Sequence, residues 1–314
     1  MHLIRGINNI DFFKKNFPNA KLVATIGNFD GLHLGHKEII KKMKSIGIAN
    51  NLESLVIFTE PHAKEFFSAN KDLSDQPTRI SPWRDKFKRL KDNSIDYGFF
   101  LKFNTKLQKM TPENFIEEVL EKLNIQYLLI GDDFKFGKER EGDFDMLLSW
   151  GKKNNIQVSK IPTYTFEQKR VSSTRIRKSL ENGDFNMAEK LLGRKYTFSG
   201  KVVFGNRLGR TIGVPTANIW VPKSNLPIKG VYAVKALIEK RQFNGIANMG
   251  IRPTVGGTSP VLEIHIFDFN KDIYGQRIEV EFHKKIREEK KFVHLDQLKD
   301  QISKDIEIAK KFLN

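Results

Sequence analysis

The order of short apolar runs and amphipathic segments changes part-way along the chain, and this change constrains the fold more than any other feature. From residue 21 to about 185, strand-like runs alternate with helical patterns: KLVATI, HKEIIKKMKSI, SLVIF, SPWRDKFKRLK, YGFFL, PENFIEEVLEKL, QYLLIG, DMLLSWGKK and IQVSKI. Such alternation predicts βαβ units and a mostly parallel, Rossmann-like α/β sheet. In sheets of this kind, ligands bind beyond the carboxyl ends of the strands, near helix N-termini.

Beyond about residue 195 the pattern becomes strand after strand. YTFSGKVVF, GVYAVKALI, FNGIANMG, VLEIHIFDF and RIEVEFHKKI alternate with period two, and the next helical pattern is HLDQLKDQISKDIEIAKKFL. This predicts a small antiparallel β-barrel followed by a terminal helix. We therefore expect two domains, 1–185 and 186–314.

The chain has no cysteine, which excludes disulfides, thiolate metal sites and cysteine nucleophiles. Its apolar runs are far shorter than the roughly 20 residues that a membrane span needs. The start, MHLIRGINNIDFF, lacks the pattern of a secretory signal. We expect a cytoplasmic protein with no membrane partner.

The net charge of +17 attracts polyanions, so nucleic acid and nucleotide phosphates are both candidate partners. Much of the excess, however, is lysine spread along helices, as in KKMK and KRLK, and this favours a solvated basic surface. A nucleic-acid-binding protein stays the alternative from another functional class.

The segment TIGNFDGLHLGHKEII at 25–40 is the most informative part of the first half. A strand leads into a glycine-rich turn, and a helix follows. Glycines let backbone N–H groups approach an anion, and the helix N-terminus favours negative charge there. His33 and His36 are three residues apart and can share a face, where they can donate hydrogen bonds to a phosphate. The alternative is a glycine-rich turn with two surface histidines.

A second segment, RVSSTRIRKSL at 170–180, places Ser173 and Thr174 before Arg175 and Arg177 at the start of a helical pattern. Helix capping alone explains many such sequences. The arginines beside the helix N-terminus also make a plausible clamp for a triphosphate.

GNFDG, HLGH and SSTRIR together closely resemble the nucleotidyltransferase half of bacterial FAD synthetases, as do FTEPHAKEFF and GDDFKFGKEREGD. The resemblance implies a nucleotidyltransferase-type domain, in which the FMN phosphate attacks the α-phosphate of ATP and pyrophosphate leaves. It implies that His33 and His36 are catalytic. The implied ATP- and phosphate-binding residues are Gly27, Phe29, Asp30, Gly31, Gly35, Ser173, Thr174 and Arg177, and the implied flavin-binding residues are His62, Asp133 and Phe134.

Some of these roles have open alternatives. Asp30 either orients a histidine or caps the turn, and His62 contacts the flavin, contacts the phosphates or is structural. Ala63 stands where the family usually has a second proline, which affects the shape of the local loop.

In the second half, GKVVFGNRLGRTIGVPTANI carries several glycines before Pro215, Thr216 and Asn218. The glycines are turn residues of a small barrel or belong to a loop that closes over phosphates. Thr216 and Asn218 are two apart, so in a strand their side chains face the same way. A hydroxyl and an amide carbonyl are hard oxygen ligands suited to Mg²⁺.

In VLEIHIFDF, alternation places Glu263, His265 and Phe267 on one face, opposite Leu262 and Ile264. A glutamate on a strand is usually solvated, but in a kinase site it can accept the proton of an attacking hydroxyl.

GRTIGVPTAN, KGVYAV, ANMGIRPT, LEIHIFDFNKDIYG and KIREEKKF together resemble the riboflavin kinase domain, in family order. Val214 stands where the family often has Phe. The resemblance implies transfer of the ATP γ-phosphate to the ribityl 5′-hydroxyl, with Glu263 as the base. It implies the phosphate-binding residues Gly205, Arg210 and Gly213, the Mg²⁺ ligands Thr216 and Asn218, and the flavin-side residues Arg287 and Phe292.

The two resemblances imply a bifunctional enzyme that uses ATP as co-substrate and Mg²⁺ as cofactor. Riboflavin, FMN and FAD are then its other ligands, and nucleic acid is not an expected partner. Retention of only one activity is the alternative within the enzyme class. Self-association is open.

Overall fold

The computed structural model describes residues 1–205, 209, 213–222, 225–254 and 257–314. Within it the chain forms two compact units. Unit 1 consists of Met1–Ala69 and Lys86–Ser172, and unit 2 of Asn70–Asp85 and Ser173–Asn314.

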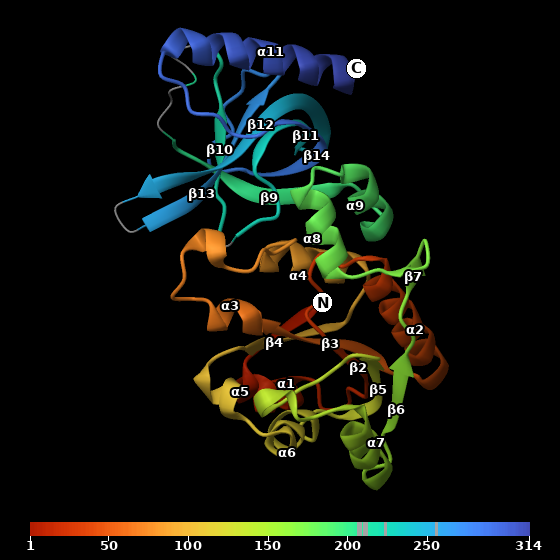
Figure 1. The fold of residues 1–314 in the computed structure, drawn as a ribbon. Coiled ribbons are helices and arrows are strands. Elements are labelled where there is room, and N and C mark those ends of the chain that lie inside the picture. The colour runs from red at the N-terminus through yellow and green to blue at the C-terminus, as the bar shows by residue number, and fades with distance from the viewer. Residues whose placement is uncertain (206–208, 210–212, 223–224, 255–256) are drawn as a thin grey trace. The chain divides into compact units, whose positions relative to one another are not determined.

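Unit 1 is built on a six-stranded sheet in which all neighbouring strands are parallel (Figure 1). The strands, in spatial order, are β1 (His2–Arg5), β4 (Tyr97–Lys102), β3 (Glu53–Glu60), β2 (Leu22–Ile26), β5 (Ile125–Gly131) and β6 (Gln157–Ile161). The parallel α/β sheet predicted from the sequence is confirmed. The edge strand β1 was missed because its four residues, HLIR, are too few to show a period.

The helices of this half are α1 (Ile10–Asn16), α2 (Leu34–Asn50), α3 (Ala63–Phe67), α4 (Trp83–Asp92), α5 (Thr105–Lys109), α6 (Pro112–Phe115), which continues as a π-helical turn (Ile116–Leu120), and α7 (Phe144–Lys153). Of these helices, α2, α4, α6 and α7 correspond to predicted segments, whereas the short helices α1, α3 and α5 were not predicted. A short hairpin of β7 (Thr165–Phe166) and β8 (Lys169–Arg170) comes before unit 2.

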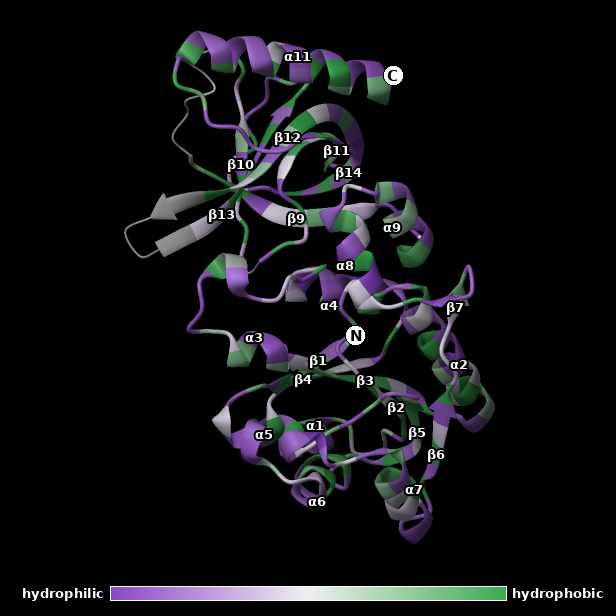
Figure 2. Ribbon diagram, viewed as in Figure 1, coloured by the Kyte–Doolittle hydropathy of each residue, from purple (hydrophilic) through white to green (hydrophobic). Residues whose placement is uncertain are grey.

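Both faces of the sheet are buried, as expected of a parallel sheet covered by helices. Leu22 and Ala24 of β2 belong to one apolar cluster and Val23 to the other. Leu147 of α7 packs into the first cluster, and Met43 of α2 packs into the second. Figure 2 shows the apolar colour of β3 and β4 between the more polar helices. This packing fixes α2 beyond the carboxyl end of β2.

Unit 2 contains a closed, antiparallel six-stranded barrel, which confirms the second predicted architecture. In spatial order its strands are β10 (Ala217–Ile219), β13 (Gly257–Ile266), β12 (Arg241–Thr254), β11 (Gly230–Ile238), β14 (Arg277–Arg287) and β9 (Tyr196–Val203). The helices are α8 (Ser173–Glu181), α9 (Phe185–Leu192) and the terminal α11 (Leu295–Leu313).

The chain passes from unit 1 to unit 2 at Ser172, before the predicted domain boundary at residue 185. The physical reason is packing: α8 packs on α9, and α9 packs against β9 and β14 of the barrel.

The segment 70–85, including the 3₁₀ turn Leu73–Asp75, also belongs to unit 2. Arg79 N–H donates to the carbonyl of Asn225 at 2.8 Å, and the Asn225 amide donates to the carbonyl of Gln76 at 2.8 Å. The Tyr196 hydroxyl donates to the carbonyl of Ile80 at 3.1 Å. These bonds tie the segment to the barrel and the loops around it.

Candidate active sites in the two units

The glycine-rich turn links the end of β2 to the start of α2. Its backbone is left-handed at Phe29 (φ 48°), Gly31 (φ 78°) and Leu32 (φ 43°), which reverses the chain within a few residues. β2 lies between β3 and β5 in the sheet, so the turn lies at the edge formed by their carboxyl ends. This is where a parallel sheet places its ligands.

His33 is the N-cap of α2, and its Nδ1 accepts a hydrogen bond from the His36 backbone N–H at 3.3 Å. The rings of His33 and His36 stack, with centroids 3.7 Å apart and planes 15° apart. Phe29, which is buried, packs on His36 with ring centroids 4.7 Å apart. Because Nδ1 of His33 accepts, the uncharged ring carries its proton on Nε2 and can donate it to a ligand.

Gly35 and Gly27 make room for these rings. A Cβ on Gly35 would lie 3.2 Å from Cε1 and Nδ1 of His33, and a Cβ on Gly27 would lie 3.2 Å from the ring of Phe29. Part of the glycine content therefore serves the packing of the aromatic stack.

His36 has a buried Nδ1 with no hydrogen-bond partner. Buried polar atoms are nearly always paired, so an orphaned nitrogen needs an explanation such as an absent ligand. Burial lowers the pKa of His36 well below its ordinary value, and the charges of His33, Lys86 and Arg170 lower it further. His36 is therefore an uncharged imidazole at neutral pH.

A second histidine site lies at the end of β3, next to β2 in the sheet. Buried His62 comes before α3, and its backbone N–H donates to the Glu65 carboxylate at 2.9 Å. Nζ of Lys86 lies 3.2 Å from Nε2 of His62 and 3.7 Å from Oε2 of Glu60. On α3 the ring of Phe67 is 61% exposed and contacts Phe66 edge-on.

Asp133 follows β5 at the same edge of the sheet. It forms an ion pair with Arg170 of β8 at 2.9 Å, and the hydrogen bond from Arg170 lowers the pKa of the Asp133 carboxyl. Phe134 is half-buried and stacks on Phe136. Asp30, in the turn after β2, is buried.

The serine–arginine segment forms α8 in unit 2, as its pattern predicts. Ser173 is the first residue of the helix, and Thr174 is exposed. Arg175 donates to the sulfur of Met187 in α9 at 3.6 Å, whereas Arg177 is half-buried.

Asn218 of β10 is buried at one end of the barrel, and Gly205 makes room for it. A Cβ on Gly205 would lie 2.3 Å from Nδ2 of Asn218. Gly205 therefore makes room for a residue that is proposed as a metal ligand.

Thr216, directly before β10, lines a cavity of about 200 Å³. The rest of its lining combines apolar residues of the strands and Pro215 with the segment Phe269–Tyr274, which is partly polar: Val202, Pro215, Ala217, Ile264, Ile266, Phe269, Asn270, Lys271, Asp272, Ile273 and Tyr274.

Glu263 pairs with Asn218 on one side and with Asn248 of β12 on the other. Cross-strand partners share a face, so a carboxylate lies between two amides on the outer face of the barrel. Nδ2 of Asn248 donates to Glu289 at 3.4 Å, and its Oδ1 is buried without a partner. The predicted alternation of β13 is observed, since Leu262 and Ile264 are buried and Glu263 is half-buried.

Arg287 ends β14 and is held by α11. Its Nε donates a hydrogen bond of 2.8 Å to Oδ2 of Asp305. One terminal nitrogen of the guanidinium, Nη2, is also 2.8 Å from the same oxygen. Phe292 is half-buried, with its ring centroid 5.8 Å from the guanidinium carbon.

Gly213, a predicted phosphate-binding residue, has a left-handed backbone, with φ 78°. Arg210 lies outside the described residues.

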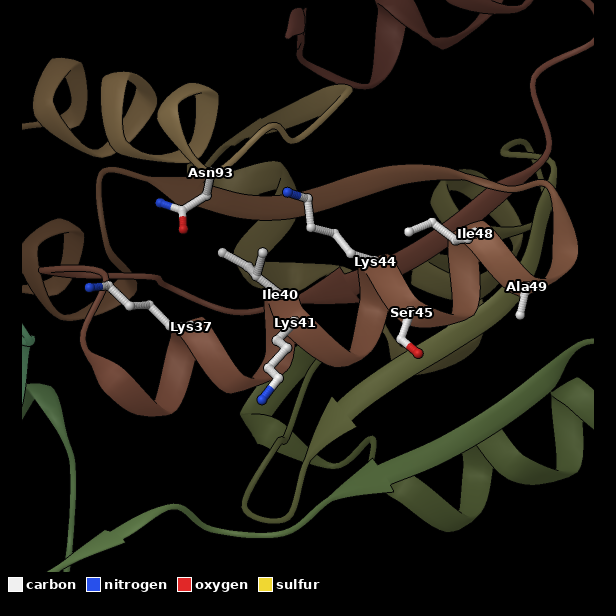
Figure 3. Close-up of a pocket in the computed structure, with 8 residues that line it drawn as sticks. All are labelled: Lys37, Ile40, Lys41, Lys44, Ser45, Ile48, Ala49 and Asn93. Atoms are coloured by element: carbon white, nitrogen blue, oxygen red, sulfur yellow. The ribbon is translucent and has the colours of Figure 1, made fainter.

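A cavity of about 700 Å³ runs along the outer side of α2 and contains none of the predicted site residues. Figure 3 shows Lys37, Lys41 and Lys44 extending from the helix, with Asn93 opposite. Its lining includes no aromatic side chain, unlike the stacking surfaces that bind single-stranded nucleic acid.

Several residues of these sites were missed by the sequence analysis: Glu60, Phe67, Lys86, Arg170, Asn248 and Glu289. Lys86 stands in a helical run of lysines and arginines, where pattern alone cannot separate it from surface lysines. Asn248 is placed beside Glu263 only by strand register, and Glu289 is linked to Asn248 by a hydrogen bond.

Two family models match the chain: the FAD synthetase model over residues 15–175 and the riboflavin kinase model over residues 192–313. A bifunctional riboflavin kinase/FMN adenylyltransferase of Haemophilus influenzae is 43% identical, with 100% of both chains covered. The protein of the same name from Escherichia coli K12 is 40% identical over 99% of this chain and 98% of that one. A solved structure described as a macrolide-efflux protein from Streptococcus pneumoniae is 29% identical with a TM-score of 0.79, covering 99% of each chain. Among the described residues, none of the helices is long and apolar enough to cross a bilayer.

Proposed function

The chain belongs to the bifunctional riboflavin kinase/FMN adenylyltransferase family, and from this premise we propose which residues perform each reaction. It is a transferase that phosphorylates riboflavin to FMN with ATP and adenylylates FMN to FAD with release of pyrophosphate. We assign adenylyl transfer to the turn between β2 and α2, and phosphorylation to the outer face of β13.

In adenylyl transfer, an FMN phosphate oxygen attacks the α-phosphorus of ATP and the bond to the leaving pyrophosphate breaks. The step needs alignment and charge stabilisation, with no covalent enzyme intermediate. His33 can donate from Nε2, and His36 offers its buried Nδ1 to a ligand. The orphaned nitrogen of His36, beside the N-terminus of α2, is the observation that carries this assignment.

The flavin of FMN is assigned to the side of the site formed by His62, Asp133 and Phe134. Phe67, an exposed ring on α3 close in sequence to His62, adds a surface on which an aromatic ring system can stack. The backbone at Gly27, Gly31 and Gly35 is proposed to approach the phosphates of ATP in unit 1. Ser173, Thr174 and Arg177 at the start of α8 stay predicted phosphate-binding residues.

In the kinase reaction, the ribityl 5′-hydroxyl attacks the γ-phosphorus of ATP, and ADP leaves. Glu263 is proposed to accept the hydroxyl proton, since its carboxylate lies between Asn218 and Asn248. The buried Oδ1 of Asn248 is an acceptor suited to a second substrate hydroxyl. The cavity beside Thr216 is proposed to hold the adenine base, between apolar residues and the polar residues Asn270 and Asp272.

Asn218 and Thr216 fit a Mg²⁺ ion carried mainly by the nucleotide phosphates, because both provide hard oxygen atoms at one end of the barrel. The Asn218 amide packs directly on Gly205, and this packing holds its oxygen in one position. When bound, Mg²⁺ neutralises charge on the transferring phosphoryl group. Gly205, Arg210 and Gly213 are proposed to approach the phosphates.

Arg287 and Phe292 are proposed to lie at the flavin side of the kinase site, with Arg287 held in place by Asp305. A cytoplasmic location, the lack of a nucleic-acid or membrane partner and the state of association stay predictions.

The experiment that tests these assignments supplies riboflavin or FMN separately, with ATP and Mg²⁺, and separates FMN and FAD by chromatography. Glu263→Ala should lower FMN formation by roughly 10²- to 10⁴-fold and leave FAD formation from supplied FMN intact. His36→Ala should stop the sequence at FMN. Loss of both activities in a folded Glu263→Ala variant, or undiminished FAD formation by His36→Ala, would contradict the assignments.

A further inference from the structure

Lys86 on α4 is buried, with 0% of its side chain exposed, although most lysines of this basic chain are solvated. Lysine is almost never fully buried unless its charge has partners. Its ammonium group contacts Nε2 of His62 at 3.2 Å and Oε2 of Glu60 at 3.7 Å. It also lies 5.0 Å from the ring centroid of buried Phe58. These contacts hold the ammonium group of Lys86 in one position.

The contact with His62 has a defined direction. An ammonium group donates hydrogen bonds and cannot accept them, so Nε2 of His62 is the acceptor. A bond at this nitrogen fixes the rotation of the ring, and a positive neighbour opposes protonation of the same ring.

The histidine pair lies at the end of the neighbouring strand, β2. The ends of β2 and β3 lie side by side, with Oγ1 of Thr59 3.3 Å from Oδ1 of Asn28. The charge of Lys86 lowers the pKa of His36, together with the charges of His33 and Arg170. One buried cation thus acts on two imidazoles at the carboxyl edge of the sheet.

We propose that Lys86 is a positioning residue for adenylyl transfer, which holds the ring of His62 in one orientation beside the phosphate-binding turn. The proposal rests on the assignment of adenylyl transfer to this turn. Lys86 itself need not touch a substrate, because its effect passes through His62. The charged groups that act on this site are His33 and His36 from the turn and α2, Glu60 from β3, Glu65 from α3, Lys86 from α4 and Arg170 from β8.

The test uses the full chain with FMN, ATP and Mg²⁺, and measures kcat and KM for FAD formation from pH 5 to 9. Lys86→Met removes the charge and keeps an unbranched, apolar side chain. We expect kcat to fall roughly 10- to 100-fold, because small displacements of aligned groups have effects of this size. We also expect the acid limb of the kcat profile to move up in pH, because the pKa of His36 rises when the cation is lost.

Riboflavin phosphorylation by the same variant is an internal control and should be unchanged, because Glu263 lies in unit 2. Lys91→Met, at an exposed lysine of the same helix, should alter neither reaction. An unchanged kcat and pH profile in Lys86→Met would overturn the proposal. Parallel loss of both activities in a Lys86→Met variant that is folded would also overturn it, since the effect would then not be specific to adenylyl transfer.

Lys86→Arg decides the matter if the methionine variant does not fold. It keeps the charge, so the acid limb should stay in place, but the planar guanidinium cannot reproduce the position of the ammonium and kcat should fall. Wild-type kcat in this variant would contradict the proposal. Wild-type protein in the same assay separates the role of Lys86 from the proposed function. If the wild-type protein fails to convert FMN to FAD, the result counts against the proposed function itself.

Discussion

Gly35 shows how a single missing Cβ makes room for the side chain of His33, which we propose to be catalytic. An alanine here would place its Cβ 3.2 Å from the ring of His33, which must then move away from His36. Alanine is also the better helix former by about 1 kcal/mol, so stability should not fall. Gly35→Ala should therefore lower FAD formation about 10-fold or more without lowering Tm. Undiminished FAD formation would show that the stacking of the two rings is unimportant.

The protonation of His36 should appear as a pH dependence of stability. The pKa of His36 is well below 6.5 in the folded chain, so below about pH 6.5 the unfolded chain binds more protons. The free energy of unfolding should fall as the pH decreases from about 6.5 towards the folded pKa of His36. Above about pH 6.5, His36 should cause no change of the free energy of unfolding with pH. NMR titration of the His36 ring checks the pKa, and His36→Gln should show a weaker decline. A midpoint at or above 6.5 would contradict this.

At the residue scale the sequence predicted which side chains meet but not how they meet. Spacing of three placed His33 and His36 on one face of α2, and their resemblance to a family motif supplied a role. The stacking of the rings, the orphaned Nδ1 and the buried Lys86 depend on tertiary packing. No periodic pattern records such contacts.

Among the elements, β13 shows where periodicity works and where it needs tertiary information. Alternation correctly placed Leu262 and Ile264 in the barrel core and Glu263 on the opposite face. Phe267 follows the same alternation, yet it is buried because it packs in a cluster with Ala309 of α11. A helix that covers part of a barrel surface is invisible to the pattern of one strand.

A buried ion pair also connects α11 to the barrel, and its contribution to stability can be tested directly. Asp305 is 1% exposed and accepts hydrogen bonds from Arg287 and Gln301. Asp305→Ala leaves the Arg287 guanidinium without its partner, so the free energy of unfolding of unit 2 should fall by about 3 kcal/mol. Asp300→Ala, at an exposed position of the same helix, should change it by about 0.5 kcal/mol or less. Chemical denaturation measures both variants, and equal effects would remove the ion pair as the cause.

For the whole molecule, the change from alternating strands and helices to strands alone was sufficient to predict both architectures. It was insufficient to predict that residues 70–85 belong to unit 2. Those residues are held largely by loop carbonyls and side chains, as in the bonds to Asn225 and from Tyr196. Contacts of this kind leave no hydrophobic period, and no family motif covered the segment.

Two units with separate cores and separately assigned sites predict that the two activities can be supplied by different molecules. A mixture of Glu263→Ala, which is expected to lose kinase activity, and His36→Ala, which is expected to lose adenylyl transfer, should convert riboflavin to FAD. FMN made by the second variant must leave it and enter the first, so FAD should appear only after FMN accumulates. Chromatography at successive times measures both products, and each variant alone is the control. FMN formation by the mixture without any FAD, while Glu263→Ala still adenylylates supplied FMN, would indicate that FMN does not pass freely between molecules.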